Sequence, residues 1–243
     1  KTAYAFDSMG NRLSKRMSGF TSSGQALDKA ENYDYDACDQ LTCVDGVGFE
    51  YDLNGNLAKK RDDMAGDMVY KFNYANRLRE VLFADGTKAQ YVYKSDGMRI
   101  SRTDRTGKTT KYYRDSSNIP EALNEGDEDG NITLNLFPGT GFKSTKNGNQ
   151  NSTQWRWFIT DHLGSVIALT DNNGIVTDEY EYDEYGNTTQ TKGSSYNPCK
   201  YIGQQYDEET GLIYLRARYY DSQTGRFVSR DPIGIGGGMN EYE

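Results

Sequence analysis

A single phrase recurs along this chain: two aromatic residues at alternate positions, then an aspartate, with a glycine three residues after it. A unit that repeats cannot be a catalytic centre in every copy, so the phrase must be architectural. A repeat of this kind favours a repetitive β structure. Its clearest copies cover residues 4–13, 49–57 and 180–187, and weaker copies cover residues 33–36, 72–78 and 91–97.

The phrase has a simple physical meaning. Aromatic side chains at alternate positions of a strand point to one face, and Tyr and Phe suit a half-buried sheet. Aspartate at the first position and glycine at the fourth are typical of a type I turn, and glycine supplies the positive φ that lets a hairpin reverse. Each unit therefore predicts strand, tight turn, strand. The Asp-x-x-Gly spacing predicts turns at Asp7, Asp45, Asp52, Asp63, Asp104, Asp127, Asp171 and Asp183.

Composition agrees with an ordered sheet. The chain has 243 residues, with 20 tyrosines, 26 glycines and only 4 prolines. A mean hydropathy of −0.88 would suggest disorder, but the regular spacing of the aromatic residues predicts strands instead. A net charge of −8 argues against a nucleic-acid scaffold and against an anionic lipid surface, and no apolar run is long enough to span a membrane. We predict an all-β protein.

Neither a metal nor a cofactor is predicted. Cys38, Cys43 and Cys199 are odd in number, which does not make a disulfide framework. With His162 they could form a zinc site of three cysteines and one histidine, but no Cys-x-x-Cys pair is present, so we expect plain thiols. The acidic residues 127–131 lack the glutamate that an EF-hand calcium loop needs, and they indicate a solvated turn.

Two segments in the second half have distinct patterns. Residues 141–154 are polar and of low complexity, which predicts a surface loop or insertion. Residues 166–170 and 175–177 are β-rich and flank an Asp-Asn-Asn-Gly sequence, which predicts a hairpin.

The stretch of residues 201–234 (YIGQQYDEETGLIYLRARYYDSQTGRFVSRDPIG) closely resembles the Rhs repeat-associated core domain. The upstream phrases resemble the YD repeats of the same family, and residues 160–166 resemble the phrase that precedes the core. The resemblance divides the chain into YD repeats (1–140), the polar loop (141–154) and the core domain (155–243). It implies hairpins that wind into a curved, spiralling sheet, which forms part of a hollow shell around a variable C-terminal toxin.

The resemblance also implies chemistry. In bacterial members the core is an aspartic autoprotease, which cuts after a motif that begins D-P-x-G and continues through G-G-x-N-x-Y; residues 231–234 and 237–242 match it. Asp231 matches the first catalytic aspartate, and Arg230 would lie where a cation can hold a carboxylate or a cut chain end. Such catalysis needs two carboxylates that share a proton. The second is expected beyond Glu243, so we expect a fragment with an incomplete dyad.

Simpler roles are open for the same residues. Asp231 before a proline can merely open a turn. His162 lies between an acidic and a hydroxyl neighbour, but a triad is defined by geometry rather than by sequence proximity, so we predict a structural histidine. Arg216, Arg218 and Arg226 lie among aromatic residues and are expected to stack on rings in the core.

Three functional hypotheses follow. The first is a structural shell segment of a secreted or surface-associated bacterial Rhs-type toxin, which encapsulates and delivers a toxic domain in interbacterial competition. Its partners would be the cargo, the rest of the parent shell, and immunity or secretion-system proteins. The second is an autoproteolytic core, latent in the fragment and active in the parent. The third is an adhesive or carbohydrate-binding module that uses Trp155 and Trp157. Open sheet edges also predict self-association.

Overall fold

The computed structural model describes residues 1–20, 26–114, 122–137, 140–146 and 149–243. The chain forms two compact units, one of Lys1–Gly86 with Phe227–Glu243 and one of Thr87–Arg226. In the described residues the only helical elements are two 3-10 turns, η1 (Tyr201–Gly203) and η2 (Gly234–Gly236). The all-β prediction is confirmed. No helix in these ranges has the length and apolar character to cross a membrane.

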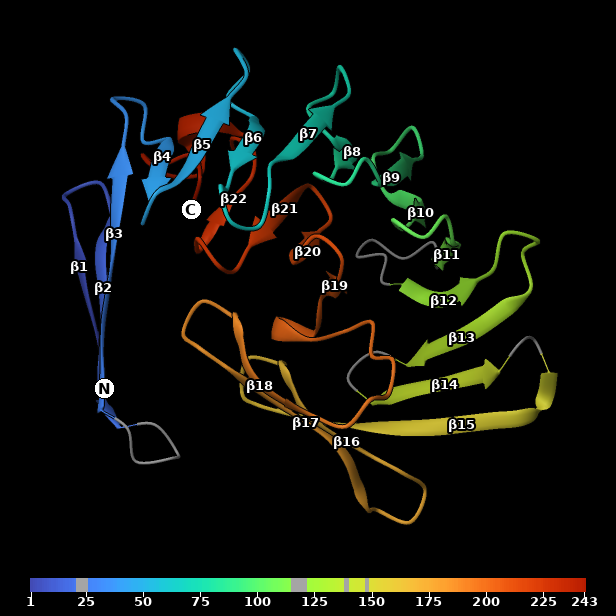
Figure 1. The fold of residues 1–243 in the computed structure, drawn as a ribbon. Coiled ribbons are helices and arrows are strands. Elements are labelled where there is room, and N and C mark those ends of the chain that lie inside the picture. Colours follow the sequence, from blue (N-terminus) through green and yellow to red (C-terminus); the bar gives the residue numbers. More distant parts are fainter. Residues whose placement is uncertain (21–25, 115–121, 138–139, 147–148) are drawn as a thin grey trace. The chain divides into compact units, whose positions relative to one another are not determined.

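The first unit is a meander of hairpins (Figure 1). Each strand pairs antiparallel with the next one along the chain. The strands are β1 (Thr2–Phe6), β2 (Arg12–Phe20), β3 (Ala26–Tyr35), β4 (Leu41–Val44), β5 (Val47–Tyr51), β6 (Leu57–Arg61), β7 (Met68–Phe72) and β8 (Leu78–Leu82).

The second unit continues the same plan in its own strands. Strands β9 to β18 again pair antiparallel in chain order. They are β9 (Lys88–Tyr93), β10 (Arg99–Thr103), β11 (Thr109–Arg114), β12 (Ala122–Gly126), β13 (Ile132–Phe137), β14 (Gly141–Lys146), β15 (Asn149–Thr160), β16 (Val166–Thr170), β17 (Val176–Tyr182) and β18 (Thr188–Lys192). The predicted hairpin of residues 166–177 is confirmed as β16 and β17.

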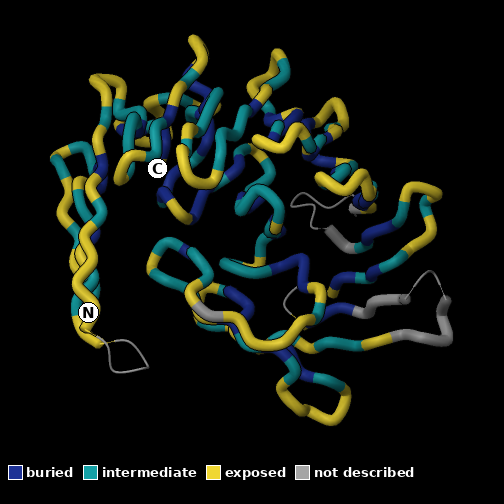
Figure 2. Tube along the Cα trace, in the orientation of Figure 1, coloured by how far each residue is buried: buried dark blue, intermediate teal, exposed yellow. Residues whose placement is uncertain are grey.

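A small second sheet completes this unit. Strands β19 (Gln205–Asp207), β20 (Leu212–Leu215) and β21 (Arg218–Asp221) pair antiparallel. The short β22 consists of Arg226, the last residue of the second unit, and Phe227, which belongs to the first unit. β20 is buried at three of its four positions, so this sheet is an internal element of the unit rather than a surface hairpin (Figure 2).

The aromatic pair of the phrase forms the core pattern. In two copies the first aromatic is buried and the second is half-buried, namely Phe49 with Tyr51 and, in the second unit, Tyr180 with Tyr182. In the first copy Tyr4 is half-buried and Phe6 is exposed. This agrees with side chains that share one face of a strand. The hairpin tips, in contrast, are exposed (Figure 2).

The recurring turn has one geometry. The Oδ1 atom of Asp7 accepts the N–H groups of Met9 and Asn11 at 2.8 and 2.9 Å, and Gly10 has φ of +87°. The register of the paired strands shifts between Ala5 and Phe6, so the turn contains one extra residue, Gly10. This geometry is a type I turn followed by a glycine bulge. The predicted turns are confirmed at Asp7, Asp52, Asp104, Asp127, Asp171 and Asp183.

Two of the predicted turns are wrong. Between Val44 and Val47 the chain reverses in two residues, with φ of +46° at Asp45 and +88° at Gly46, because Asp-Gly suits a type I′ turn. The turn predicted at Asp63 begins instead at Asp62, whose Oδ1 accepts the N–H groups of Met64 and Ala65. Asp62 directly follows the last residue of β6, so its side chain is the one in position to close the turn.

The surface loop predicted for residues 141–154 is also wrong, whereas the alternative of an insertion stays a prediction. In the described part of this stretch the backbone forms β14 and the start of β15, paired from Gly141 opposite Trp157 onward. A strand ladder depends on backbone hydrogen bonds, so a polar composition does not prevent pairing. The predicted boundary between YD repeats and core remains a prediction.

Candidate functional site

The two predicted site residues, Arg230 and Asp231, lie in the tail (Phe227–Glu243) of the first unit. The tail folds back on itself. The N–H of Asp231 donates to the carbonyl of Glu241 at 2.9 Å, and the N–H of Phe227 donates to the carbonyl of Tyr242 at 3.0 Å. The residues between Asp231 and Glu241 form a loop that contains η2, and its hydrophobic residues Ile233, Ile235 and Met239 are exposed. Asp231 therefore lies at the neck of this loop.

The carboxylate of Asp231 has a defined setting. Its Oδ1 accepts the N–H of Ile233 at 2.9 Å, and its carbonyl accepts the N–H of Gly234 at 2.9 Å. The residue therefore does open an Asp-Pro turn. A Cβ at Gly237 would lie 2.9 Å from the Asp231 Oδ2, so a larger residue at this position would crowd the second carboxylate oxygen. Acid catalysis by this group would still require a second carboxyl.

Arg230 contacts a different carboxylate from that of Asp231. Its Nε lies 3.3 Å from the Glu241 Oε2 and 3.3 Å from the Tyr242 hydroxyl. The hydrogen bond with Tyr242, opposed by burial and supported by the charge of Glu241, raises the pKa of the Arg230 guanidinium. A cation thus holds a carboxylate in the tail, on the residue that closes the neck of the loop.

Two buried side chains anchor the tail to hairpin turns of the same unit. The Tyr242 hydroxyl donates to the carbonyl of Gly55 at 2.8 Å and accepts from the Gln40 side chain at 3.0 Å. The Asn240 amide donates to the Asn11 Oδ1 at 2.9 Å. These contacts join residues about 190 to 230 positions apart in the sequence, so no local pattern predicts them.

The second unit contains a buried ion cluster (Arg99, Arg102, Asp207 and Glu209). Asp207 accepts from the Arg99 Nη1 at 2.6 Å and from the Arg102 Nη1 at 2.8 Å. Both Arg99 and Asp207 are almost fully buried. Because removing one partner from a buried pair leaves an unpaired charge, the cluster ties β19 firmly to β10.

Tyrosine rings surround the cluster. The Arg99 guanidinium carbon lies 4.5 Å from the ring centre of Tyr214 and 4.7 Å from that of Tyr112, which is close enough for cation–π attraction. Beside the cluster, the Tyr196 hydroxyl donates to the Glu125 Oε2 at 3.1 Å. Burial raises the pKa of Glu125, and burial likewise raises the pKa of Glu209 despite the nearby Arg102. This arrangement is structural, since its charged groups pair with one another at buried positions, Arg99 and Arg102 with Asp207 and Arg102 with Glu209.

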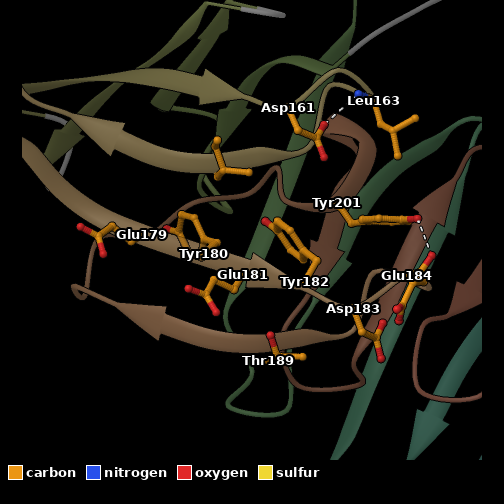
Figure 3. Close-up of a pocket in the computed structure, with 11 residues that line it drawn as sticks. Asp161, Leu163, Glu179, Tyr180, Glu181, Tyr182, Asp183, Glu184, Thr189 and Tyr201 are labelled. Carbon is orange, nitrogen blue, oxygen red and sulfur yellow. Dashed lines mark hydrogen bonds between the residues drawn. The ribbon is translucent and has the colours of Figure 1, made fainter. Parts of the chain in front are cut away.

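An acidic groove of about 640 Å³ lies in the second unit (Figure 3). In the close-up, Tyr201 lies beside Glu184, and its hydroxyl donates to the carbonyl of that residue at 3.3 Å. Burial opposes ionisation of Asp161, but the N–H groups of Ser165 and Leu163 outweigh it and lower the pKa of that carboxyl. The carboxyl side chains along the groove are Asp161, Glu179, Glu181, Asp183 and Glu184.

The remaining candidates do not form a site in the described residues. No group of three or more His, Cys, Asp or Glu side chains in these ranges is placed to hold a metal ion. Within these ranges Cys38, Cys43 and Cys199 form no disulfide. His162 is exposed in the turn that Asp161 opens.

Sequence reasoning missed Arg99 and Arg102, although one signal was present. Arg12 and Arg99 each follow a turn glycine by two residues, in Gly10-Asn11-Arg12 and Gly97-Met98-Arg99. Both arginines are buried, and the Arg12 guanidinium lies 4.2 Å from the ring centre of Tyr33. In both turns, an arginine two residues after the turn glycine therefore indicated a buried cation. Of the three predicted stacking arginines, Arg226 is buried and the other two are half-buried.

The comparisons with known proteins identify the class. The family model of the teneurin YD-shell matches residues 1–234. The chain belongs to this family, which confirms the YD-repeat resemblance. It is 33% identical over 234 residues to the tRNA nuclease WapA of Bacillus subtilis, covering 94% of this chain and 9% of that protein.

Other relatives give the same picture. The chain is 40% identical over 86 residues to the toxin protein Tse5 of Pseudomonas aeruginosa, covering 35% of this chain and 6% of the relative. Its fold is similar to that in the crystal structure of TcdB2-TccC3 without the hypervariable C-terminal region, with a TM-score of 0.55, 19% identity, and coverage of 100% of this chain and 16% of that one. The chain thus spans about a tenth of the curated relatives that it matches first.

Proposed function

We propose that this chain is a wall segment of a bacterial toxin shell, which sequesters, protects and delivers a toxic domain that follows it in a longer parent. The observation that carries the proposal is the match over 94% of the chain to a much longer protein named as a nuclease. The successive antiparallel hairpins support it, because such a meander can continue indefinitely as a wall. The parent would be secreted or surface-associated, and its partners would be the cargo and the rest of the shell.

Protease protection tests the shell. In the intact parent, the region after Glu243 should resist trypsin for far longer than the same region expressed alone, because a wall excludes the protease. A parent carrying Asp207→Ala, which breaks the buried ion cluster, should lose much of this protection. A parent with the exposed Asp129→Ala is the matched control. Equal digestion of the region in the parent and alone would contradict the proposal.

A second candidate is self-cleavage of the parent, with Asp231 as one carboxyl of an acid pair. The placement of Asp231 at the neck of the tail loop, with Gly237 against its Oδ2, favours it. Arg230 would hold Glu241 in place next to it. Intact mass of the parent with its native downstream sequence would show two pieces for the wild type and one for Asp231→Asn. Asp63→Asn is the control, since Asp63 is exposed in a turn; equal cleavage in Asp231→Asn and wild type would remove Asp231 from the mechanism.

An adhesive role has weaker support. The Trp155 and Trp157 rings stack with centroids 5.4 Å apart and an interplanar angle of 8°, and Phe137 stacks on Trp155. Trp157 and Phe137 are partly exposed and could contact a sugar. The rings cover part of one another, so less ring face is open. Glycan-array binding that Trp157→Ala abolishes would support this role, and flat binding would count against it.

A further inference from the structure

We propose that Asn240 and Tyr242 are positioning residues, which register the tail on three hairpin turns and thereby fix the loop neck where Asp231 lies. Their functional meaning rests on the proposed self-cleavage. The registration itself concerns this chain alone and is measurable without any cleavage.

The anchors flank the residue that closes the neck. Glu241 accepts the N–H of Asp231 through its carbonyl and contacts Arg230 through its carboxylate. Asn240 and Tyr242, directly before and after it, are both buried, whereas the preceding Met239 is exposed. Glu241 is therefore held between two fixed points, and its position sets the position of the Asp231 backbone.

Tyr242 engages two turns and the base of the tail. Its hydroxyl contacts the carbonyl of Gly55, the side chain of Gln40 and the Nε of Arg230. Its ring packs edge-on against Tyr51, with centroids 5.6 Å apart. The Tyr242 hydroxyl thus contacts both the β3–β4 turn and the β5–β6 turn.

Asn240 engages the first turn of the chain. Its amide donates to the Asn11 Oδ1 and to the carbonyl of Met9. Asn11 in turn donates to Asp7 in its own turn and to Asp39 in the β3–β4 turn. The contact therefore passes from the tail through one repeat to the next.

The repeat itself supplies this docking surface. Asn11 and Gln40 both lie four residues after the aspartate that opens their turn, Asp7 and Asp36. At that position the backbone N–H is bound by the aspartate, and the side chain contacts the tail, through the Oδ1 acceptor of Asn11 and the Nε2 donor of Gln40. In these two turns the polar residue that follows the positive-φ residue, Gly10 or Asp39, thus contacts the tail as well as closing its turn.

Hydrogen exchange of the 243-residue chain tests the registration. The variants are Tyr242→Phe, which keeps the ring and removes the hydroxyl contacts, and Asn240→Ala. The matched controls are the exposed Tyr74→Phe and Asn54→Ala. Loss of these hydrogen bonds should speed exchange at the amides of Phe227 and Asp231 by about tenfold, with unchanged circular dichroism. Unchanged exchange at these two amides in both variants would overturn the registration.

The parent with its native downstream sequence tests the consequence for chemistry. The first-order self-cleavage rate should fall about tenfold in Tyr242→Phe, and its pH profile should shift, because the setting of the Asp231 carboxyl changes. Faster exchange with a wild-type rate and pH profile would overturn the positioning role. A wild-type parent that stays uncut would remove the self-cleavage proposal and the catalytic part of this one, while the exchange result would still decide the registration.

Discussion

Each unit contains a segment that is held by contacts with residues distant in the sequence: the tail in the first unit and β19 in the second. The two segments are held by different kinds of contact. In the first unit the tail is fixed by neutral groups, through the buried Asn240 and Tyr242. In the second unit β19 is fixed by full charges, with Arg99 and Arg102 on the carboxylate of Asp207. Neutral hydrogen bonds contribute about 1 kcal/mol each, whereas a broken buried ion pair costs about 3–5 kcal/mol. The tail can therefore be released locally, and β19 cannot be released without a large loss of stability.

This difference fits the roles proposed for the two segments. A wall element has to stay in place, and a single charged cluster with tightly packed tyrosines resists local opening. A segment that carries reactive groups has to be aligned but also able to adjust. Several modest contacts spread over three turns give alignment with a lower barrier to movement.

The largest expected effect comes from Asp207→Ala. The variant leaves the guanidinium groups of Arg99 and Arg102 buried without their shared carboxylate. We expect a loss of about 3–5 kcal/mol in the free energy of unfolding, measured by urea denaturation. The double variant Arg99→Met with Asp207→Leu should recover part of this loss, because apolar groups replace the pair.

The control for this effect is Asp129→Ala, since Asp129 is exposed. It should change the free energy of unfolding by less than about 0.5 kcal/mol. A loss in Asp207→Ala no larger than in the control would show that the ion cluster does not hold β19, and the contrast between the two units would then disappear.

Asn11→Ala tests the neutral side of the comparison. It removes the acceptor for Asn240 and the donor to Asp7 and Asp39, in a residue that is 1% exposed. The expected loss is about 1–3 kcal/mol in urea denaturation. A double-mutant cycle with Asn240→Ala should give a coupling energy of about 0.5–1.5 kcal/mol. Additive losses would mean that the two amides act independently of each other.

The hairpin architecture was predictable from the sequence because it is local. The aspartate and glycine of each turn lie three residues apart, and Asp7, Asp52 and Asp183 form the predicted geometry. The errors at Asp45 and Asp63 arose where two turn signals overlap, as with Asp45-Gly46 and the adjacent Asp62. The pairing of β14 with β15 was missed because backbone hydrogen bonds leave little trace in a polar sequence.

The candidate sites were predictable only in part. Family resemblance supplied Arg230 and Asp231, since they match a motif. Nothing local shows that Tyr242 contacts Gly55, or that Arg99 pairs with Asp207 108 residues later. Such contacts depend on which turns the folded chain brings together, and a sequence pattern carries only the periodicity of each element.

A smaller effect is expected from glycine at the turns. Gly46 in the first unit and Gly107 in the second both have φ of +88°, and a Cβ on either would meet nothing within 4 Å. Alanine at each position should therefore cost only the backbone strain, about 1–2 kcal/mol, and asparagine less. If thermal unfolding shows equal losses of stability for the two alanine variants, the turns of both units contribute equally to stability. A shift of one transition only, in either variant, would show that the units unfold separately.

The smallest effect concerns pH and the charged unit. Burial raises the pKa of Glu125 above its value in the unfolded chain, so its contribution is fully present below the unfolded pKa and is lost as pH rises through the folded pKa. Glu125→Gln keeps the hydrogen bond with Tyr196 and removes this titration. The variant should therefore lose less stability than wild type as the pH rises above the ordinary pKa of a glutamate, about 4.3. Denaturation at several pH values measures the difference, with the exposed Glu128→Gln as the control. Parallel pH curves for wild type and Glu125→Gln would mean that Glu125 does not contribute to the pH dependence of the free energy of unfolding.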